Sequence, residues 1–262
     1  MTLVNAAIVP HSPILIPTIG RENFDSVKNT KNALEELEKE IYQHNIDTII
    51  ILSSPHENIS DNYLINHSPN LIAKFESFGD METKLEFKND LELGYKIRER
   101  TETTFGVNLT SENELSHNFS VPLYYLSKHL KNLLILPISY SKQTYQNHFE
   151  FGRVIRKIIN ESNKRIIVIA TGDLSHKLTK EAPGGFSNKA KDFDNLILKT
   201  IKNRKLDKLT KIDTKVVKEA EECILNSLVL LAGILDKTNY KSNILSYEFP
   251  FGVGYLVANL II

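Results

Sequence analysis

Short apolar runs alternate with amphipathic stretches along this chain, and this alternation restricts its fold more than any other feature. Residues 4–9, 47–53 and 165–171 have the length of strands and each contains a continuous apolar core. Residues 23–44 instead carry apolar side chains at helical spacing, with Glu and Lys between them. Strands that are apolar on both faces are typical of a largely parallel sheet covered by helices.

The remaining segments continue this pattern. We expect further helices over residues 89–103, 121–130, 145–159, 192–203 and 215–235, and further strands over residues 133–139, 244–247 and 254–261. The last two strands favour a short antiparallel pair. The sequence therefore predicts one α/β domain over residues 1–262, a three-layer αβα arrangement around a mixed, largely parallel sheet.

Composition excludes several classes of protein. The 262 residues include 32 basic and 32 acidic side chains, so nothing in the net charge favours general nucleic-acid binding. Cys223 is the sole cysteine, which excludes an intrachain disulfide and fits a reducing cytoplasm. The N-terminus does not have the pattern of a signal peptide, and the longest apolar run is far shorter than the roughly 20 residues of a membrane span. We expect a soluble, cytoplasmic protein.

Three histidines follow predicted strands within a few residues. His11 follows the first strand, His56 the second, and His176 the strand over residues 165–171. Ligands of open α/β sheets bind beyond the carboxyl ends of the strands, so these three side chains can share one site. Histidine in such a place serves metal binding or proton transfer, although each one alone could simply form a hydrogen bond within its loop.

Other candidates are less clear from spacing. His117 precedes a predicted helix and could face the same cavity, but a surface loop would explain it equally well. Glu222, Glu248 and Asp173 are candidate carboxylate ligands. Glu222 adjoins a very apolar stretch, where a lone charge would be costly to bury unless a cation offsets it. Two histidines and one carboxylate suit a non-haem Fe(II) oxygenase and equally a hydrolytic zinc site.

Five segments in order resemble the class III extradiol ring-cleavage dioxygenases of the LigB-like superfamily. They are residues 9–17 (VPHSPILIP), 54–56 (SPH), 117–123 (HNFSVPL), 171–178 (TGDLSHKL) and 245–255 (LSYEFPFGVGY). The last segment, together with Glu221, Glu222 and Cys223, is similar to the Memo-related subgroup, which is associated with the AmmeMemoRadiSam system. The resemblance covers almost the whole chain.

The resemblance implies roles for particular residues. His11 and His56 match the two metal histidines, His176 the catalytic base, and His117 the second active-site histidine. The third ligand matches Glu222 or Cys223, since ring-cleaving relatives have a Glu there and Memo a Cys. We expect Glu222 to be the ligand, because Fe(II) beside dioxygen favours oxygen over thiolate. Cys223 would then pack into the helix as a small apolar residue.

The chain departs from the family pattern at three places near the pocket. The expected Asp-His-Gly is Ser116, His117 and Asn118, and Phe249 and Ile224 replace two glycines. These departures leave the implied metal site intact but bear on catechol cleavage.

Three functions therefore stay open. The first is an Fe(II)-dependent extradiol dioxygenase that cleaves a small aromatic diol with O₂. The second is a Memo-like metal-binding protein that assists a radical-SAM enzyme without dioxygenase turnover. The third is a zinc hydrolase on the same residues. We expect Fe(II) as the cofactor, or zinc or another divalent metal in the protein as isolated. We also expect a homo-oligomer that binds neither nucleic acid nor membrane, and the resemblance implies radical-SAM and AMMECR1-like proteins as further partners.

Overall fold

The three apolar runs lie side by side in the middle of one sheet. The structure is a computed structural model that describes residues 2–54 and 59–262. Within it, β1 (Leu3–Val9), β9 (Ile166–Thr171) and β2 (Thr48–Ser53) are buried along their whole length. β9 pairs in parallel with both β1 and β2, and β2 pairs in parallel with β8 (Leu134–Ser139). The carboxyl ends of these four strands therefore meet at one edge of the sheet.

The outer strands make the sheet mixed. In the described residues eleven strands form one sheet, in the order β10-β11-β1-β9-β2-β8-β5-β4-β7, and β3 pairs with β6 and β8. The other strands of the sheet are β3 (Tyr63–Asn66), β4 (Asn70–Phe75), β5 (Asp80–Asn89), β6 (Val107–Thr110), β7 (Glu114–Leu115), β10 (Lys241–Glu248) and β11 (Tyr255–Ile261). β10 and β11 pair with each other antiparallel, as do β4 and β5.

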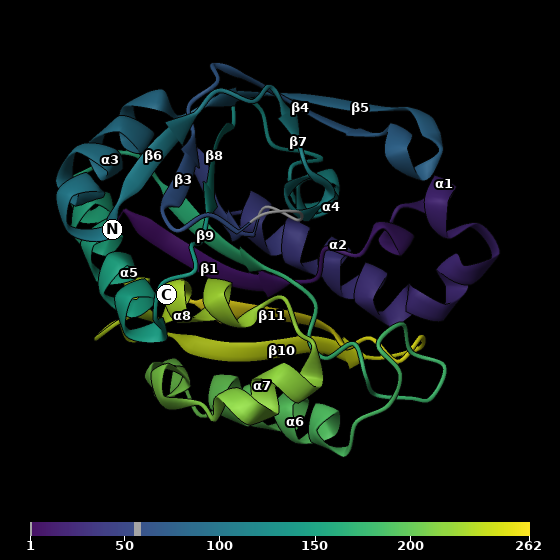
Figure 1. Ribbon diagram of the computed structural model, residues 1–262. Helices are drawn as coiled ribbons and strands as arrows, with labels where there is room; N and C mark the ends of the chain where they lie inside the picture. The colour runs from purple at the N-terminus through teal and green to yellow at the C-terminus, as the bar shows by residue number, and fades with distance from the viewer. Residues whose placement is uncertain (1, 55–58) are drawn as a thin grey trace.

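Helices cover both faces of the sheet (Figure 1). On one face α2 (Lys28–Tyr42) and α4 (His117–Leu126) enclose an apolar core. A second core lies on the other face, under α3 (Leu91–Phe105), α5 (Tyr145–Asn160), α6 (Asn188–Lys202) and α8 (Leu225–Ile234). The shorter helices are α1 (Pro17–Gly20) and α7 (Thr214–Ala220). The three-layer α/β prediction is confirmed.

Two expectations about elements are wrong. The single helix expected over residues 215–235 is two helices, α7 and α8, which are separated by Glu221 in a left-handed conformation (φ 52°, ψ 48°). The helix expected to begin at residue 121 begins at His117, directly after its N-cap, Ser116. Both differences place candidate site residues at helix ends.

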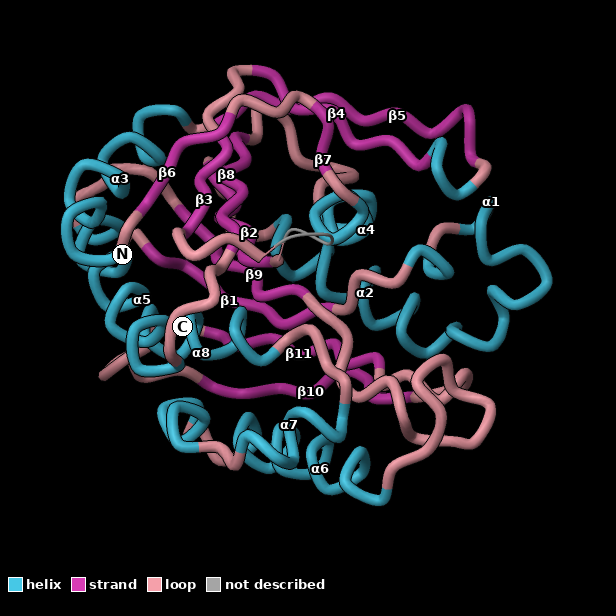
Figure 2. Tube along the Cα trace, viewed as in Figure 1, coloured by secondary structure: helices cyan, strands magenta, loops and turns pink. Residues whose placement is uncertain are grey.

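A two-stranded arm that the sequence did not predict extends from the sheet. β4 and β5 form an antiparallel hairpin, and β5 meets β8 only at Lys88 and Asn89. Figure 2 shows this arm passing above α4 toward α1. Its tip carries Phe78, which reaches the candidate site.

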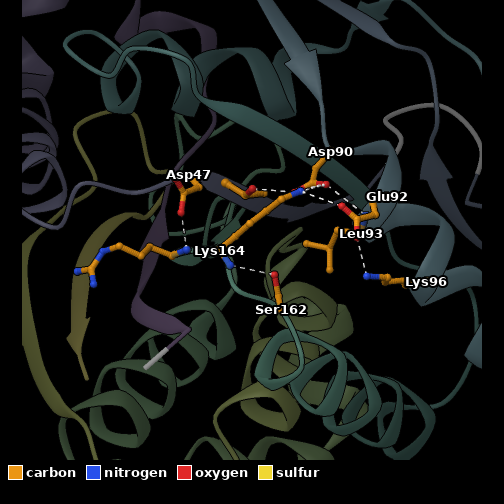
Figure 3. Close-up of polar contacts among 9 residues, drawn as sticks. Asp47, Asp90, Glu92, Leu93, Lys96, Ser162 and Lys164 are labelled. Atoms are coloured by element: carbon orange, nitrogen blue, oxygen red, sulfur yellow. Dashed lines mark hydrogen bonds and ion pairs between the residues drawn. The ribbon is translucent and has the colours of Figure 1, made fainter.

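A partly buried ion pair joins elements at the opposite edge of the sheet (Figure 3). The Asp90 carboxylate accepts hydrogen bonds from Thr48 Oγ1 (2.7 Å) and from the backbone N–H of Leu93 (3.2 Å), and Lys164 Nζ lies 2.7 Å from Asp90 Oδ1. Thr48 is the first residue of β2, so this cluster lies at the amino ends of the parallel strands. It connects β2, α3 and the turn before β9, far along the strands from the histidines.

None of the helices in the described part of the chain has the length and apolar character needed to cross a membrane.

Candidate metal centre

The carboxyl edge of the parallel strands brings His11 against Cys223. His11 follows β1, is 3% exposed, and has its Nε2 3.3 Å from Cys223 Sγ. Its backbone N–H donates to Asp173 Oδ1 (3.1 Å). Asp173 follows β9 and is buried, and this burial raises the pKa of its carboxyl to about 7. One carboxylate thus fixes the loop that carries His11.

Cys223 lies between this histidine and the loop after β9. Asp173 N–H donates to Cys223 Sγ (3.2 Å), and Cys223 N–H donates to the Asp173 carbonyl (3.2 Å). Burial raises the pKa of the thiol well above its usual value. The expectation that Cys223 packs away into the helix as a small apolar residue is wrong. The helix breaks two residues earlier, and the break turns the sulfur toward His11.

The two glutamates considered as ligands make other contacts. Glu222 Oε2 accepts hydrogen bonds from the backbone N–H groups of Ile224 (2.7 Å) and Leu225 (2.6 Å), at the start of α8. Burial raises the pKa of Glu222 to about 7. Both Glu248 oxygens bind residues at the start of α2, Oε1 accepting from Thr30 N–H (2.7 Å) and Oε2 from Asn29 Nδ2 (2.9 Å). Glu222 as a metal ligand stays a prediction, and the contacts give its carboxylate a helix-capping role.

His117 lies beside His11 at the mouth of a cavity. The two imidazole rings meet edge to face with their centroids 5.8 Å apart. The ring of Phe78, from the arm, also meets the His117 ring edge to face, with centroids 5.1 Å apart. His117 and Phe78 line a cavity of about 680 Å³ together with residues of β3, β7 and β8. The next residue, Asn118, is fully buried and donates through Nδ2 to the carbonyl of Ser54 (2.6 Å). The N-terminus of α4 therefore supports the loop after β2 as well as the cavity wall.

His176 lies against the segment that follows α7. Its Nδ1 binds the backbone carbonyl of Glu221, and its backbone N–H donates to the Ala220 carbonyl (2.9 Å). His176 is not among the described residues that line the cavity beside His117. Its expected place across one pocket from His117 stays a prediction. His11, His117 and His176 each make at least one further interaction, so none of the three is without a partner.

His56, the second predicted metal histidine, lies outside the described residues. Within residues 2–54 and 59–262, no group of three or more His, Cys, Asp or Glu side chains is arranged to hold a metal ion. The described chain does supply two neighbouring donors, His11 Nε2 and Cys223 Sγ. Imidazole nitrogen and thiolate sulfur are ligands for transition metals, so these residues fit a metal of that class.

Sequence reasoning missed two residues of the site. Phe78 reaches His117 only because the arm folds over α4. The sequence did not predict the strand pair that forms this arm. Asn118 was noted only as a departure from Asp-His-Gly, whereas the structure makes it the donor to the Ser54 carbonyl. An amide directly after a candidate catalytic histidine was the available signal.

Comparisons with known proteins show the family to which this chain belongs. The family described as "Catalytic LigB subunit of aromatic ring-opening dioxygenase" matches residues 5–258. Protein CA_C1420 of Clostridium acetobutylicum is 32% identical over 99% of this chain and 58% of its own length. The MEMO1 family protein MMP1387 of Methanococcus maripaludis is 35% identical over 38% of this chain and 34% of its own length. The chain thus spans less than two thirds of either relative.

A solved structure shows the same fold. The uncharacterized protein JW3007 from Escherichia coli K12 superposes with a TM-score of 0.67 over 99% of this chain and 100% of its own, at 13% sequence identity. At that identity the likeness concerns the fold alone. With a family match from residue 5 to residue 258 and MEMO1 family proteins among its relatives, the chain belongs to the LigB-like superfamily and to its Memo-related subgroup.

Proposed function

We propose that this chain binds a divalent transition metal through His11, His56 and Cys223 and works as a Memo-like metal protein rather than as a ring-cleaving dioxygenase. The observation that carries the proposal is the position of Cys223 Sγ, 3.3 Å from His11 Nε2, while the Glu222 carboxylate accepts two backbone N–H groups of α8. A sulfur donor in place of a carboxylate favours softer metals than a dioxygenase site does.

The other residues of the site have supporting roles in this proposal. Asp173 holds the His11 loop through its backbone N–H and exchanges two hydrogen bonds with Cys223. Asn118 holds Ser54, two residues before His56. A bound metal would supply Lewis-acid or redox chemistry beside His11, whose ring contacts that of His117. Radical-SAM and AMMECR1-like proteins stay the expected partners of this chain.

Ring cleavage with Fe(II) is the second candidate, and the state of His176 favours it. Because a carbonyl only accepts hydrogen bonds, the contact with Glu221 places the ring proton on Nδ1 and makes Nε2 the accepting nitrogen. Such a nitrogen can take the proton of a catechol hydroxyl at neutral pH. His117 would form the wall of the substrate cavity.

Metal affinity measured on two neighbouring variants tests the proposal. The protein is purified without oxygen and titrated with Fe(II), Zn(II) and Co(II). Cys223→Ser should weaken binding by roughly 100-fold or more, since loss of a ligand exceeds the effects of outer-shell changes. The matched control, Glu222→Gln, retains a carbonyl oxygen for the start of α8 and should stay within a few-fold of wild type. The reverse ranking would contradict the proposal and restore Glu222 as the ligand.

Oxygen uptake with a panel of catechols separates the two candidates. A Memo-like protein loaded with iron should show no uptake above that of free iron. Substrate-dependent uptake that His176→Ala abolishes, with metal content unchanged, would establish the dioxygenase instead.

A further inference from the structure

Two short segments, one of which contains Cys223, are joined along their length by hydrogen bonds. One is residues 173–176, after β9, and the other is residues 220–223, between α7 and α8. The Ala220 carbonyl accepts from His176 N–H (2.9 Å) and from Ser175 Oγ (3.0 Å). The Glu221 carbonyl accepts from His176 Nδ1. At the far end, Asp173 and Cys223 exchange the two bonds already described. The candidate base and the candidate metal ligand thus belong to one bonded unit.

The backbone conformation of Glu221 lets the second segment make all of these contacts. Its φ of 52° and ψ of 48° lie in the left-handed region, which side chains other than Gly, Asn and Asp adopt seldom. This residue ends α7 and turns the chain. The turn aims the carbonyl of Glu221 at His176 and carries Cys223, two residues on, to His11. A helix continued through residue 221 would have kept that carbonyl within its own hydrogen-bond ladder.

The side chain of Glu221 is held by the same loop. Lys177 Nζ lies 3.0 Å from Glu221 Oε1, and Oε2 occupies the space that a side chain on Gly184 would fill. Gly184 N–H in turn donates to the His176 carbonyl (3.2 Å). These contacts hold the side chain of Glu221 against the loop that follows His176.

We propose that Glu221 is a positioning residue: its left-handed backbone fixes the Nδ1–H tautomer of His176 and presents Cys223 to His11. The part that concerns Cys223 rests on the proposed metal function, and the part that concerns His176 does not.

Four variants separate the backbone of Glu221 from its charge. Glu221→Gly and Glu221→Asn keep access to the left-handed region, Glu221→Val disfavours it strongly, and Glu221→Gln keeps the backbone preference but removes the charge facing Lys177. The first readout is the ¹⁵N NMR spectrum of histidine-labelled protein, in which His176→Asn assigns the His176 signals. The second readout is zinc affinity.

The Gly, Asn and Gln variants should keep His176 in the Nδ1–H tautomer and bind zinc within about threefold of wild type. The Val variant should show a mixture of tautomers and lose about tenfold or more in zinc affinity, the size of an outer-shell effect on a metal site. If the Val variant does not fold, Glu221→Ala replaces it, with a smaller change in the same direction.

A Val or Ala variant that folds, keeps the single tautomer and binds zinc normally would overturn the proposal. The same holds if the Gln variant alone reproduces the losses, because the charge rather than the backbone would then position the site. If wild type binds no metal while the tautomers change as expected, the proposed function fails and the positioning of His176 stands.

Discussion

A single buried amide connects the N-terminus of α4 to the loop after β2. Asn118 is fully buried and donates to the Ser54 carbonyl, so its removal leaves that carbonyl without this donor. Leaving a buried acceptor unsatisfied costs about 1–3 kcal/mol. Asn118→Ala should therefore lower the free energy of unfolding by about that amount and also weaken zinc binding, because His56 follows Ser54 by two residues.

Asn89→Ala is the matched control for this prediction. Asn89 Nδ2 donates to the carbonyls of Asn66 and Ser68, away from His11 and Cys223. Urea denaturation should show a comparable loss of stability in both variants, with unchanged zinc affinity in Asn89→Ala. If the two variants lost zinc affinity to the same extent, Asn118 would act on the stability of the fold alone.

The buried carboxylate of Asp194 gives a pH dependence with a definite sign. It accepts hydrogen bonds from Ser175 N–H (3.0 Å) and Tyr247 Oη (2.7 Å), and burial raises its pKa to about 6. In the unfolded chain its pKa is about 4. Between these values the folded state binds the proton more tightly, so this group adds stability as pH falls from about 7 to about 4.

Thermal melts at pH 7 and pH 5 check this sign. Asp194→Asn should gain less stability on acidification than wild type, by about 1 kcal/mol, since all other titrating groups are shared. Identical pH profiles of the two proteins would contradict the raised pKa.

At the scale of elements, the end of β9 requires a glycine because two segments meet there. A Cβ atom on Gly172 would lie 2.6 Å from Ile224 Cα and 2.8 Å from the Cys223 carbonyl oxygen. Gly172→Ala would push the segment that carries Cys223 away from β9. It should cost about 1–3 kcal/mol of stability and lower zinc affinity.

Gly152→Ala provides a comparison outside the site. Gly152 allows α5 to approach the Leu230 carbonyl of α8, so its replacement should also destabilise the protein. Zinc affinity per folded molecule, measured after correction for the folded fraction, should fall only in Gly172→Ala. A loss of affinity in both variants would assign the effect to α8 packing rather than to the close contact at Cys223.

The sequence predicted the elements whose apolar side chains are buried on both faces better than those with one face in solvent. β1, β2 and β9 are buried on both faces, so their continuous apolar runs were evident. β5 alternates charged and apolar residues in an arm with solvent on one side, and it was missed. The break at Glu221 was missed because no Gly or Pro marks it and the apolar spacing continues through Ile224. That break places Cys223 beside His11, a contact that the sequence did not predict, whereas the metal ligands themselves stay predictions.

At the scale of the whole molecule, the two edges of the sheet have different roles. We expect the amino edge to contribute to stability and the carboxyl edge to carry the functional site. The amino edge carries the Asp90–Lys164 ion pair, with Asp90 buried and Lys164 partly exposed, and no candidate site residue lies in that cluster (Figure 3). Lys164→Met would leave the Asp90 carboxylate without its cation. We expect a loss of about 1–3 kcal/mol in urea denaturation, below the 3–5 kcal/mol of fully buried pairs.

Zinc affinity of the folded Lys164→Met protein should equal that of wild type. Weaker zinc binding in this variant would show that the two edges of the sheet are coupled, and it would contradict the division of stability and function between them.

In the proposed metal centre a sulfur atom of this chain, rather than a carboxylate, binds the metal beside His11. Co(II) substitution tests it most directly, because only a thiolate ligand produces an intense sulfur-to-cobalt charge-transfer band in the near ultraviolet. We predict that the Co(II)-loaded wild type and Glu222→Gln show this band and that Co(II)-loaded Cys223→Ser does not. Bound Co(II) without the band in wild type, or a band that persists in Cys223→Ser, would contradict it.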